Sequence, residues 1–398
     1  MTNKSNFLEY FPPMGIYETL YKFQSIFGSY MGGPGTHPWS QGFPLTSQIP
    51  NGPKIPDQIK ITTDDLKYPK AWGLPELRSV IANYYNDHYG SKIDQNNIMI
   101  FAGGRPALIS ILMFLQKDIQ IRIASTEYTP YYDMLEILNK KYTLVNSCED
   151  NLFNPSVGDF LGQNKSVREL ILISNPCNPT GITKTTNELK NLVENASFNL
   201  SGLLVDEAYE LFHEPPVSAM SYIKDIDNSN FFLTGAATKG LQAPGIRIGW
   251  VVTSKKNIEI LGNFSSFGMG GVSRPSQLYA LELFNKKRIN LARSAIPKFY
   301  REQRDRYKEA FTKLGFKIFS GKGGFYHWCK LPNNITSEKF NDHLFKHGAA
   351  ILKGTDCDMA RKKHHSVLKE FFRFSFGPLK LDSFELDIKI LSKVLDEL

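Results

Sequence analysis

The middle of the chain alternates short apolar runs with longer amphipathic runs, and this alternation restricts the possible folds more than any other feature. Two amphipathic runs, residues 106–116 and 131–141, have helical length and spacing. Strands that alternate with helices usually form a parallel sheet covered on both faces, and ligands then gather at the carboxyl ends of the strands. We therefore predict an α/β fold with a mostly parallel sheet. The apolar runs of strand length lie at residues 98–102, 121–126, 170–174, 202–206, 231–236 and 246–252.

The two ends of the chain differ from this middle part. Residues 14–30 predict a helix, and the Gly/Pro-rich arm that follows has too few periodic apolar residues to form its own core. After about residue 285, a long charged helix and two strands are typical of a smaller α+β domain. We predict a helix and arm that join the small domain, a large domain, and a small C-terminal domain, at residues 1–45, 46–285 and 286–398.

Composition limits the classes of partner. A chain of 398 residues with 41% hydrophobic residues can bury a full core. The net charge of +8 is spread along the chain, and its one dense basic run, Arg361–His365, accompanies no nucleic-acid-binding motif. The four cysteines show no paired spacing, and no apolar run reaches membrane length. We therefore predict a cytoplasmic protein without a disulfide framework, a zinc site, a nucleic-acid partner or a membrane partner.

One stretch, residues 234–250, carries a distinctive pair of basic residues. Small residues precede Lys239, and a turn through Pro244 and Gly245 leads to Arg247. An amine can form a Schiff base with an aldehyde cofactor, and a guanidinium can bind the phosphate of that cofactor. The pair therefore indicates pyridoxal phosphate as the cofactor.

Three other predicted strands end in residues that suit the same ligand. Gly103 and Gly104 let backbone amides approach a phosphate at the start of a helix. The segment Ser174–Gly181 (SNPCNPTG) holds the Asn178 amide in a stiff loop. Asp206 ends an apolar strand, where a carboxylate needs a cationic partner such as a protonated pyridine nitrogen.

Together these motifs resemble the class I and II aminotransferases, the pyridoxal-phosphate enzymes of fold type I. SNPCNPTG, VDEAY, the TK of GAATKG with GIRIG, and FRFSFG stand in the family's order, and the likeness runs from Gly42 to Gly377. The resemblance implies a large domain with a seven-stranded, mostly parallel sheet and a small α+β domain built from both chain ends. It also implies a homodimer that moves an amino group between an amino acid and a 2-keto acid by a ping-pong mechanism.

The resemblance also implies roles for individual residues. Lys239 would hold the cofactor and move the Cα proton, Asp206 would keep the pyridine nitrogen protonated, and Tyr209 with Asn178 would bind the phenolic oxygen. Arg373 would bind the substrate carboxylate, with Gly42 closing over the substrate. Tyr128 would stack on the cofactor. The implied phosphate ligands are Thr238, Arg247, the amides of Gly104 and Arg105 and, from the neighbouring subunit, Tyr68 and Ser273.

The chain departs from the family's pattern at a few positions. Ala236 stands where a phosphate-binding serine is usual, and Lys353-Gly354 replaces a common Pro-Gly. Met269 stands where aspartate-specific relatives carry an arginine for the second carboxylate, so we expect a preference for neutral or apolar side chains. Arg105 is the competing candidate for binding an acidic side chain.

Other activities use the same set of residues. A carbon–sulfur β-lyase, a decarboxylase or synthase, and an oxidase would all need Lys239, Asp206 and Arg247. A ligand sensor without catalysis is a further alternative, which the complete lysine site disfavours.

Overall fold

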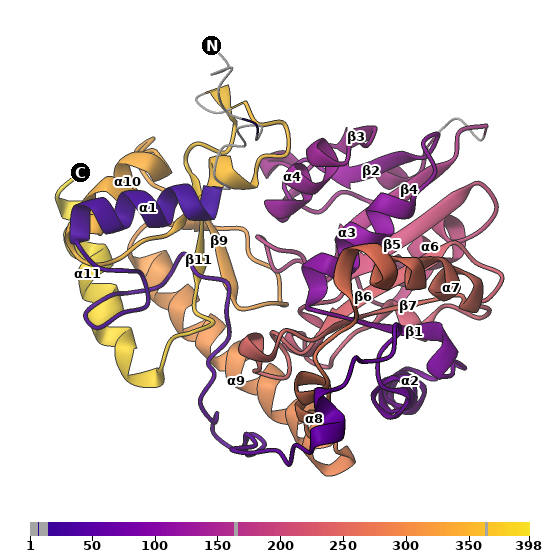
Figure 1. Cartoon of the computed structure of the whole chain (residues 1–398). Coiled ribbons are helices and arrows are strands. Elements are labelled where there is room, and N and C mark those ends of the chain that lie inside the picture. The colour runs from indigo at the N-terminus through magenta and orange to yellow at the C-terminus, as the bar shows by residue number, and fades with distance from the viewer. Residues whose placement is uncertain (1–6, 8–14, 163–165, 363–364) are drawn as a thin grey trace.

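The computed structural model describes residues 7, 15–162, 166–362 and 365–398. In Figure 1 the larger sheet and its helices form the right-hand lobe, and a smaller sheet forms the left-hand lobe. Of the basic run at Arg361–His365, residues 363 and 364 lie outside the described residues. None of the described helices is both long and apolar enough to cross a lipid bilayer.

The larger sheet has seven strands in the order β1-β7-β6-β5-β4-β2-β3. Only β7 runs antiparallel to its neighbours, so the prediction of a mostly parallel sheet is confirmed. The strands are β1 (Ile98–Phe101), β2 (Gln120–Ala124), β3 (Tyr142–Val145), β4 (Glu169–Ser174), β5 (Ser201–Asp206), β6 (Phe231–Ala236) and β7 (Gly249–Thr253).

Apolar residues on both faces of this sheet explain its uninterrupted apolar strands. In β1, Ile98 and Ile100 belong to one hydrophobic core and Met99 and Phe101 to another, because successive side chains of a strand point to opposite faces. Helices cover these cores: α2 (Pro75–Tyr89), α3 (Gly104–Phe114), α4 (Pro130–Ile137), α5 (Val157–Phe160), α6 (Thr186–Ala196), α7 (Lys255–Phe264) and α8 (Arg274–Leu283).

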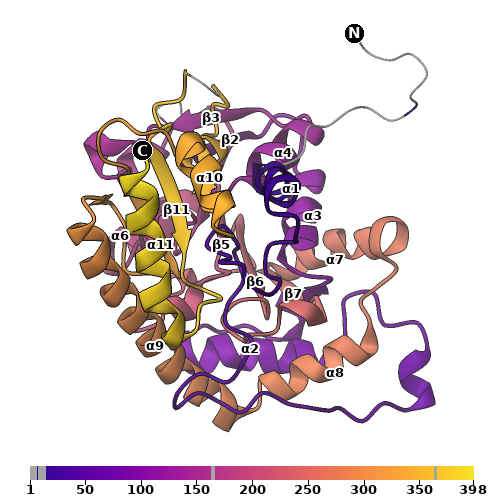
Figure 2. The same ribbon diagram turned by 90° about the vertical axis from the view of Figure 1, so that its left-hand side faces the viewer.

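The smaller sheet is antiparallel, with the order β10-β11-β9-β8. Helix α1 (Gly15–Phe27) packs against α10 and β10, so the first helix lies on the C-terminal part of the chain (Figures 1 and 2). The domain boundaries after residues 45 and 285 stay predictions. The elements of this lobe are α9 (Lys286–Lys313), β8 (Lys317–Ile318), β9 (Tyr326–Lys330), α10 (Ser337–Lys346), β10 (Leu352–Lys353), β11 (Phe371–Ser375) and α11 (Phe384–Asp396).

Some elements differ from the sequence prediction. The first helix ends at Phe27 and not at residue 30, because Gly28 takes a φ of +81° that stops a helix. Strand β3 was not predicted; it has four residues at the sheet edge, and only Val145 is buried. Its weak apolar pattern explains why it was missed.

Candidate active site

Two adjoining cavities lie at the larger lobe, and the second is also lined by residues of the smaller lobe. The first has a volume of about 320 Å³ and opens at the carboxyl ends of β4 and β5, and the second has a volume of about 240 Å³. Five predicted residues line both cavities: Arg105, Tyr128, Asn178, Tyr209 and Lys239. Gly104, Asp206, Thr238 and Arg247 line the first cavity alone, and Gly42 and Arg373 line the second alone. We call them the cofactor cavity and the substrate cavity.

Lys239 follows β6 and reaches the boundary between the two cavities. Its Nζ donates a short hydrogen bond to the Gly42 carbonyl, which belongs to the arm after α1. Burial and, to a smaller extent, the charges of Arg373, Arg105 and Arg247 together lower the pKa of the Lys239 amine to about 7. A large fraction of this amine is therefore neutral and nucleophilic near pH 7.

Asp206 is the last residue of β5 and lies at the bottom of the cofactor cavity. Its carboxylate accepts hydrogen bonds from the Tyr131 hydroxyl at 2.8 Å, the Thr234 hydroxyl at 3.1 Å and the Ala208 amide at 3.2 Å. Burial raises the Asp206 pKa, while these donors act in the opposite direction. Among the described residues no cationic side chain forms an ion pair with Asp206. A protonated ring nitrogen fits this position, because it would supply the missing cation.

The turn between β1 and α3 forms the other end of the cofactor cavity. Gly103 has a φ of +103°, and a Cβ at this residue would lie 2.5 Å from Nη2 of Arg247. The first residue of α3, Gly104, lines the cavity, so the amino end of an 11-residue helix faces the same space as the guanidinium. A helix amino end together with a guanidinium fits a phosphate group.

Arg373 is a buried cation in the substrate cavity. It is 4% exposed, and it donates to the Asn178 side-chain oxygen at 2.8 Å and to the Ser40 carbonyl at 2.7 Å. Its guanidinium carbon lies 4.2 Å from the centre of the Tyr326 ring. Among the described residues, no acceptor forms a hydrogen bond with the Nε of Arg373, and no carboxylate forms an ion pair with its guanidinium.

Two tyrosines complete the cavity walls. The Tyr128 hydroxyl accepts a hydrogen bond from Nε of Arg105 at 3.0 Å. The Tyr209 hydroxyl forms a short hydrogen bond with the Tyr326 hydroxyl. A Cβ on Gly42 would lie 2.9 Å from the same Tyr326 hydroxyl, so the arm passes directly over the substrate cavity.

Sequence reasoning missed several residues of the site. Thr234 lies opposite Asp206 in the β5–β6 register, and Tyr131 lies in the first turn of α4, three residues after Tyr128. Both positions could therefore have been found from the sequence. Tyr326 and Tyr17 reach the substrate cavity from β9 and α1, and no spacing in the sequence relates them to Lys239.

Tyr68 and Ser273 lie outside both cavities. The Tyr68 side chain is 94% exposed, and Ser273 caps the start of α8. Their two segments are close together, because a Cβ on Gly271 would lie 2.6 Å from Pro69 and Arg274 pairs with Asp65 at 2.8 Å. Both residues therefore belong to one exposed surface of the subunit.

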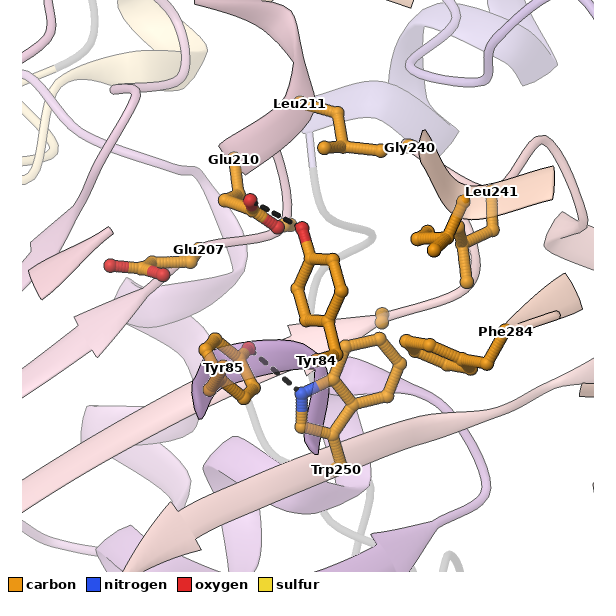
Figure 3. Close-up of a pocket in the computed structure, with 12 residues that line it drawn as sticks. Tyr84, Tyr85, Glu207, Glu210, Leu211, Gly240, Leu241, Trp250 and Phe284 are labelled. Atoms are coloured by element: carbon orange, nitrogen blue, oxygen red, sulfur yellow. Dashed lines mark hydrogen bonds between the residues drawn. The ribbon is translucent and has the colours of Figure 1, made fainter. Parts of the chain in front are cut away.

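A small cavity next to the site is lined by two further buried carboxyl groups (Figure 3). Glu210 accepts a hydrogen bond from the Tyr84 hydroxyl at 2.6 Å, and the Trp250 indole donates to the Tyr85 hydroxyl at 3.0 Å. Glu207 accepts from the Ala219 amide at 2.6 Å, but its Oε2 has no donor among the described residues. Burial raises the Glu207 pKa to about 8 and the Glu210 pKa to about 6.

Comparison with known proteins identifies relatives of the chain. The sequence profile of the family described as aminotransferase class I and II matches residues 37–381. An aspartate aminotransferase of Pyrococcus horikoshii is 25% identical over 71% of this chain and 73% of its own length. An L-glutamine–4-(methylsulfanyl)-2-oxobutanoate aminotransferase of Bacillus subtilis is 23% identical over 72% of this chain and 73% of its own length.

Solved structures agree on the fold. The aspartate aminotransferase of Thermotoga maritima superimposes with a TM-score of 0.77, covering 97% of this chain and 98% of its own, at 18% identity. The Thermus thermophilus enzyme with maleate gives a TM-score of 0.75 at 20% identity, over 96% of this chain and 97% of its own. The chain thus has the fold type I architecture. It belongs to the class I and II aminotransferase family, and it is a pyridoxal-phosphate-dependent aminotransferase that acts on an amino acid and a 2-keto acid.

Proposed function

We propose that the cofactor cavity holds pyridoxal phosphate through Lys239, with the ring nitrogen at Asp206 and the phosphate at the start of α3. Asn178 and Tyr209 would bind the phenolic oxygen, and Tyr128 would cover one face of the ring. The phosphate ligands from the same subunit would be Arg247, Thr238 and the backbone amides of Gly104 and Arg105.

The observation that carries this proposal is the set of unpaired charges around Lys239. Asp206 is a buried carboxyl group without a cationic partner, and Arg373 is a buried guanidinium without a carboxylate, each within the described residues. Burying an unpaired charge costs several kcal/mol, so such groups are retained where a ligand supplies the opposite charge. A cationic ring nitrogen and an amino-acid carboxylate are the two charges that these residues lack.

The chain's own residues then have defined tasks. When bound, the cofactor supplies a sink for the electron pair that remains after Cα loses its proton. Arg373 would bind the substrate carboxylate by two parallel hydrogen bonds and so turn the Cα–H bond toward Lys239. The Lys239 amine, displaced by the substrate amine, would take this proton and return it as a general acid. The arm at Gly42 would exclude water from the reacting atoms.

The substrate cavity favours a neutral or apolar side chain. Five apolar residues line it, and Met269, at the end of a π-helix, lies outside both cavities of its own subunit. Besides Arg373 and Lys239, Arg105 is the one cationic side chain among the described residues that line this cavity, and its Nε already donates to Tyr128. The apolar lining residues are Ile16, Leu20, Phe43, Pro130 and Leu352.

A spectroscopic panel tests this function. Amino acids are added one at a time to the purified protein with its cofactor, and the absorbance of the lysine-bound cofactor is followed. We expect conversion to the amine form of the cofactor, with release of the 2-keto acid. We also expect neutral donors such as alanine, methionine or phenylalanine to give higher specificity constants than aspartate or glutamate.

Two results would contradict the proposal. Release of pyruvate and ammonia would identify a lyase reaction. A tenfold or larger preference for aspartate or glutamate that disappears in Arg105→Ala would assign the recognition of an acidic side chain to Arg105.

We further propose that the active unit is a cytoplasmic homodimer. The exposed surface that carries Tyr68 and Ser273 would cover the cavity of the neighbouring subunit and add two phosphate ligands there. The exposed apolar side chains of Leu66 and Phe267, which are 75% and 65% exposed, are consistent with such a contact. We propose neither a nucleic acid nor a membrane as a partner, because the one dense basic run, Arg361–His365, accompanies no nucleic-acid-binding motif and no apolar run of the sequence reaches membrane length.

A further inference from the structure

Glu127 is a buried carboxyl group for which the proposed mechanism has no role. It lies between β2 and α4, directly before Tyr128, and is 2% exposed. Among the described residues it forms no ion pair with any cationic side chain. A buried acid without a cation is costly unless its oxygens form hydrogen bonds.

The carboxyl group of Glu127 connects two loops of the cofactor cavity. Its Oε1 accepts a hydrogen bond from the Tyr128 amide at 3.1 Å, and it also forms a short hydrogen bond with the Ser174 hydroxyl. The Ser174 hydroxyl oxygen in turn accepts a hydrogen bond from the backbone amide of Asn178 at 3.1 Å. Because that lone pair is occupied, the hydroxyl hydrogen of Ser174 is free to point at Glu127. A continuous series of hydrogen bonds thus runs from the Asn178 loop to the Tyr128 loop.

Both ends of this series reach residues that line the cavities. Tyr128 faces the cofactor cavity, and the Asn178 side chain accepts from Arg373 at 2.8 Å. The backbone amide of Glu127 also donates to the Cys357 carbonyl at 3.2 Å, in the loop before β11. Glu127 is therefore the residue at which three loops around the site meet.

The charge of Glu127 is constrained by its neighbours. The groups that face it are the Ser174 hydroxyl, the Tyr128 amide, the Asp206 carboxyl group and the Cys177 thiol, whose Sγ lies 3.9 Å from each carboxyl oxygen. Burial raises the Glu127 pKa to about 8, and the Asp206 carboxylate acts in the same direction. A neutral Glu127 places no second negative charge beside the Asp206 carboxyl group and still accepts both hydrogen bonds at Oε1.

We propose that Glu127 is a positioning residue for transamination, which fixes Tyr128 directly and, through Ser174, fixes the Asn178 loop that holds Arg373. The proposal rests on the function proposed above for those three residues. In this proposal Glu127 acts as a neutral hydrogen-bond acceptor and not through a negative charge.

Two substitutions separate these possibilities. Glu127→Gln keeps an acceptor oxygen at Oε1 without an ionisable proton, whereas Glu127→Leu keeps a similar volume without any acceptor. We expect Gln to leave kcat and KM within about threefold of the wild-type values, because each hydrogen bond has a replacement. We expect Glu127→Leu to raise the KM for the amino-acid substrate by about tenfold or more, because the Tyr128 backbone amide and the Ser174 hydroxyl lose their hydrogen-bond acceptor.

Hydrogen exchange of the full-length chain, with and without cofactor, reports the positioning without relying on turnover. In Glu127→Leu, amides in peptides covering residues 125–131 and 172–181 should exchange faster than in the wild type. Glu207→Leu is the matched control, because Glu207 is also buried and follows Asp206 in the chain, whereas its carboxyl group accepts a hydrogen bond from the Ala219 amide, outside both loops. It should leave exchange at residues 172–181 unchanged.

The outcomes are distinguishable. Wild-type exchange at residues 172–181 together with an unchanged KM in a folded Glu127→Leu variant would overturn the proposal, as would a Gln variant as impaired as Leu. Should Glu127→Leu fail to fold, Ser174→Ala replaces it and should speed exchange at residues 172–181 alone. Exchange is measured even when no amino acid is transaminated, so failure of the proposed function would be recognised separately.

Discussion

Lys239 is the residue on which the proposed chemistry depends most. No other amine lines either cavity in the part of the chain that the structure describes. Lys239→Ala should therefore abolish the covalent attachment of the cofactor and lower turnover by roughly 10²- to 10⁴-fold from the lost proton transfer alone. Borohydride reduction followed by mass spectrometry of tryptic peptides measures the attachment directly.

A second buried lysine provides the control for this variant. Lys184 is 7% exposed and pairs with Glu188 at 2.5 Å, away from the cavity linings. Lys184→Ala should keep the reducible link even if it lowers stability. A link that survives in Lys239→Ala would show that another amine carries the cofactor.

The environment of Lys239 also predicts a pH dependence. Its pKa lies near 7 in place of 10.5, so the amine is protonated and unreactive below pH 6 and becomes neutral as the pH rises through 7. The rate at which the cofactor-free protein captures pyridoxal phosphate should rise with pH up to about 8 and then level off. Stopped-flow absorbance measures this rate, with N-acetyl-lysine as the reference amine. A protein rate that keeps rising in parallel with that reference to pH 10 would contradict the lowered pKa.

At the scale of elements, the turn between β1 and α3 would hold the phosphate of the proposed cofactor. Gly103→Ala should raise the dissociation constant of the cofactor and lower the melting temperature. The new Cβ would lie 2.5 Å from the Arg247 guanidinium, which is too close for an ordinary contact. In addition, an alanine at this φ of +103° costs about 1–3 kcal/mol. Fluorescence titration and thermal unfolding measure the two effects.

The adjacent glycine is a matched control for this turn. A Cβ at Gly104 would lie 3.7 Å from the Ala236 side chain, an ordinary contact, and its φ is not in the left-handed region. Gly104→Ala should therefore change stability and cofactor affinity much less than Gly103→Ala. Equal effects of the two substitutions would contradict both the clash with Arg247 and the cost of a positive φ at residue 103.

The sequence predicted the elements that carry strong local signals. The apolar run that ends at Asp206 predicted β5, because a strand buried on both faces needs an uninterrupted apolar sequence. The same logic missed β3, where one residue of four is buried. The placement of Tyr17 and Tyr326 at the substrate cavity depends on how α1 and β9 pack, and local pattern contains no information about such packing.

At the scale of the whole molecule, buried carboxyl groups tie stability to pH. The Glu207 pKa lies at about 8 in the folded chain against 4.5 for an ordinary glutamate. When folding raises the pKa of an acid, the free energy of unfolding decreases as the pH rises from the pKa of the unfolded state to the pKa of the folded state. Glu207 should therefore lower the free energy of unfolding by a few kcal/mol between pH 5 and pH 8.

Glu207→Gln removes this titration. The stability of the variant relative to the wild type should increase steadily from pH 5 to pH 8 and stay constant above pH 8, because the glutamine has no proton to lose. Urea unfolding at each pH, followed by circular dichroism, gives the two free energies. Parallel curves for the two proteins across this range would show that Glu207 has an ordinary pKa.

The proposed homodimer makes a stronger prediction than subunit association. If Tyr68 binds the phosphate in the neighbouring subunit, then each active site takes Lys239 from one chain and Tyr68 from the other. Lys239→Ala therefore removes a residue from the site of its own chain, whereas Tyr68→Ala removes a residue from the site of the partner chain. In a mixed dimer, one site would combine the intact Lys239 of the Tyr68→Ala chain with the intact Tyr68 of the Lys239→Ala chain. When equal amounts of the two variants mix at random, half of the dimers contain one chain of each variant. Each of these mixed dimers has one intact site.

Mixing the two variants after mild dissociation should therefore restore about a quarter of the wild-type activity at limiting cofactor, far above the sum of the separate variants. The physical reason is that Tyr68 is 94% exposed on its own subunit and lines neither of that subunit's cavities, so its proposed contact with the phosphate requires a second chain. Light scattering establishes the mass of each sample. An active monomer, or a mixture no more active than its parts, would exclude a shared site and leave Tyr68 as a surface residue.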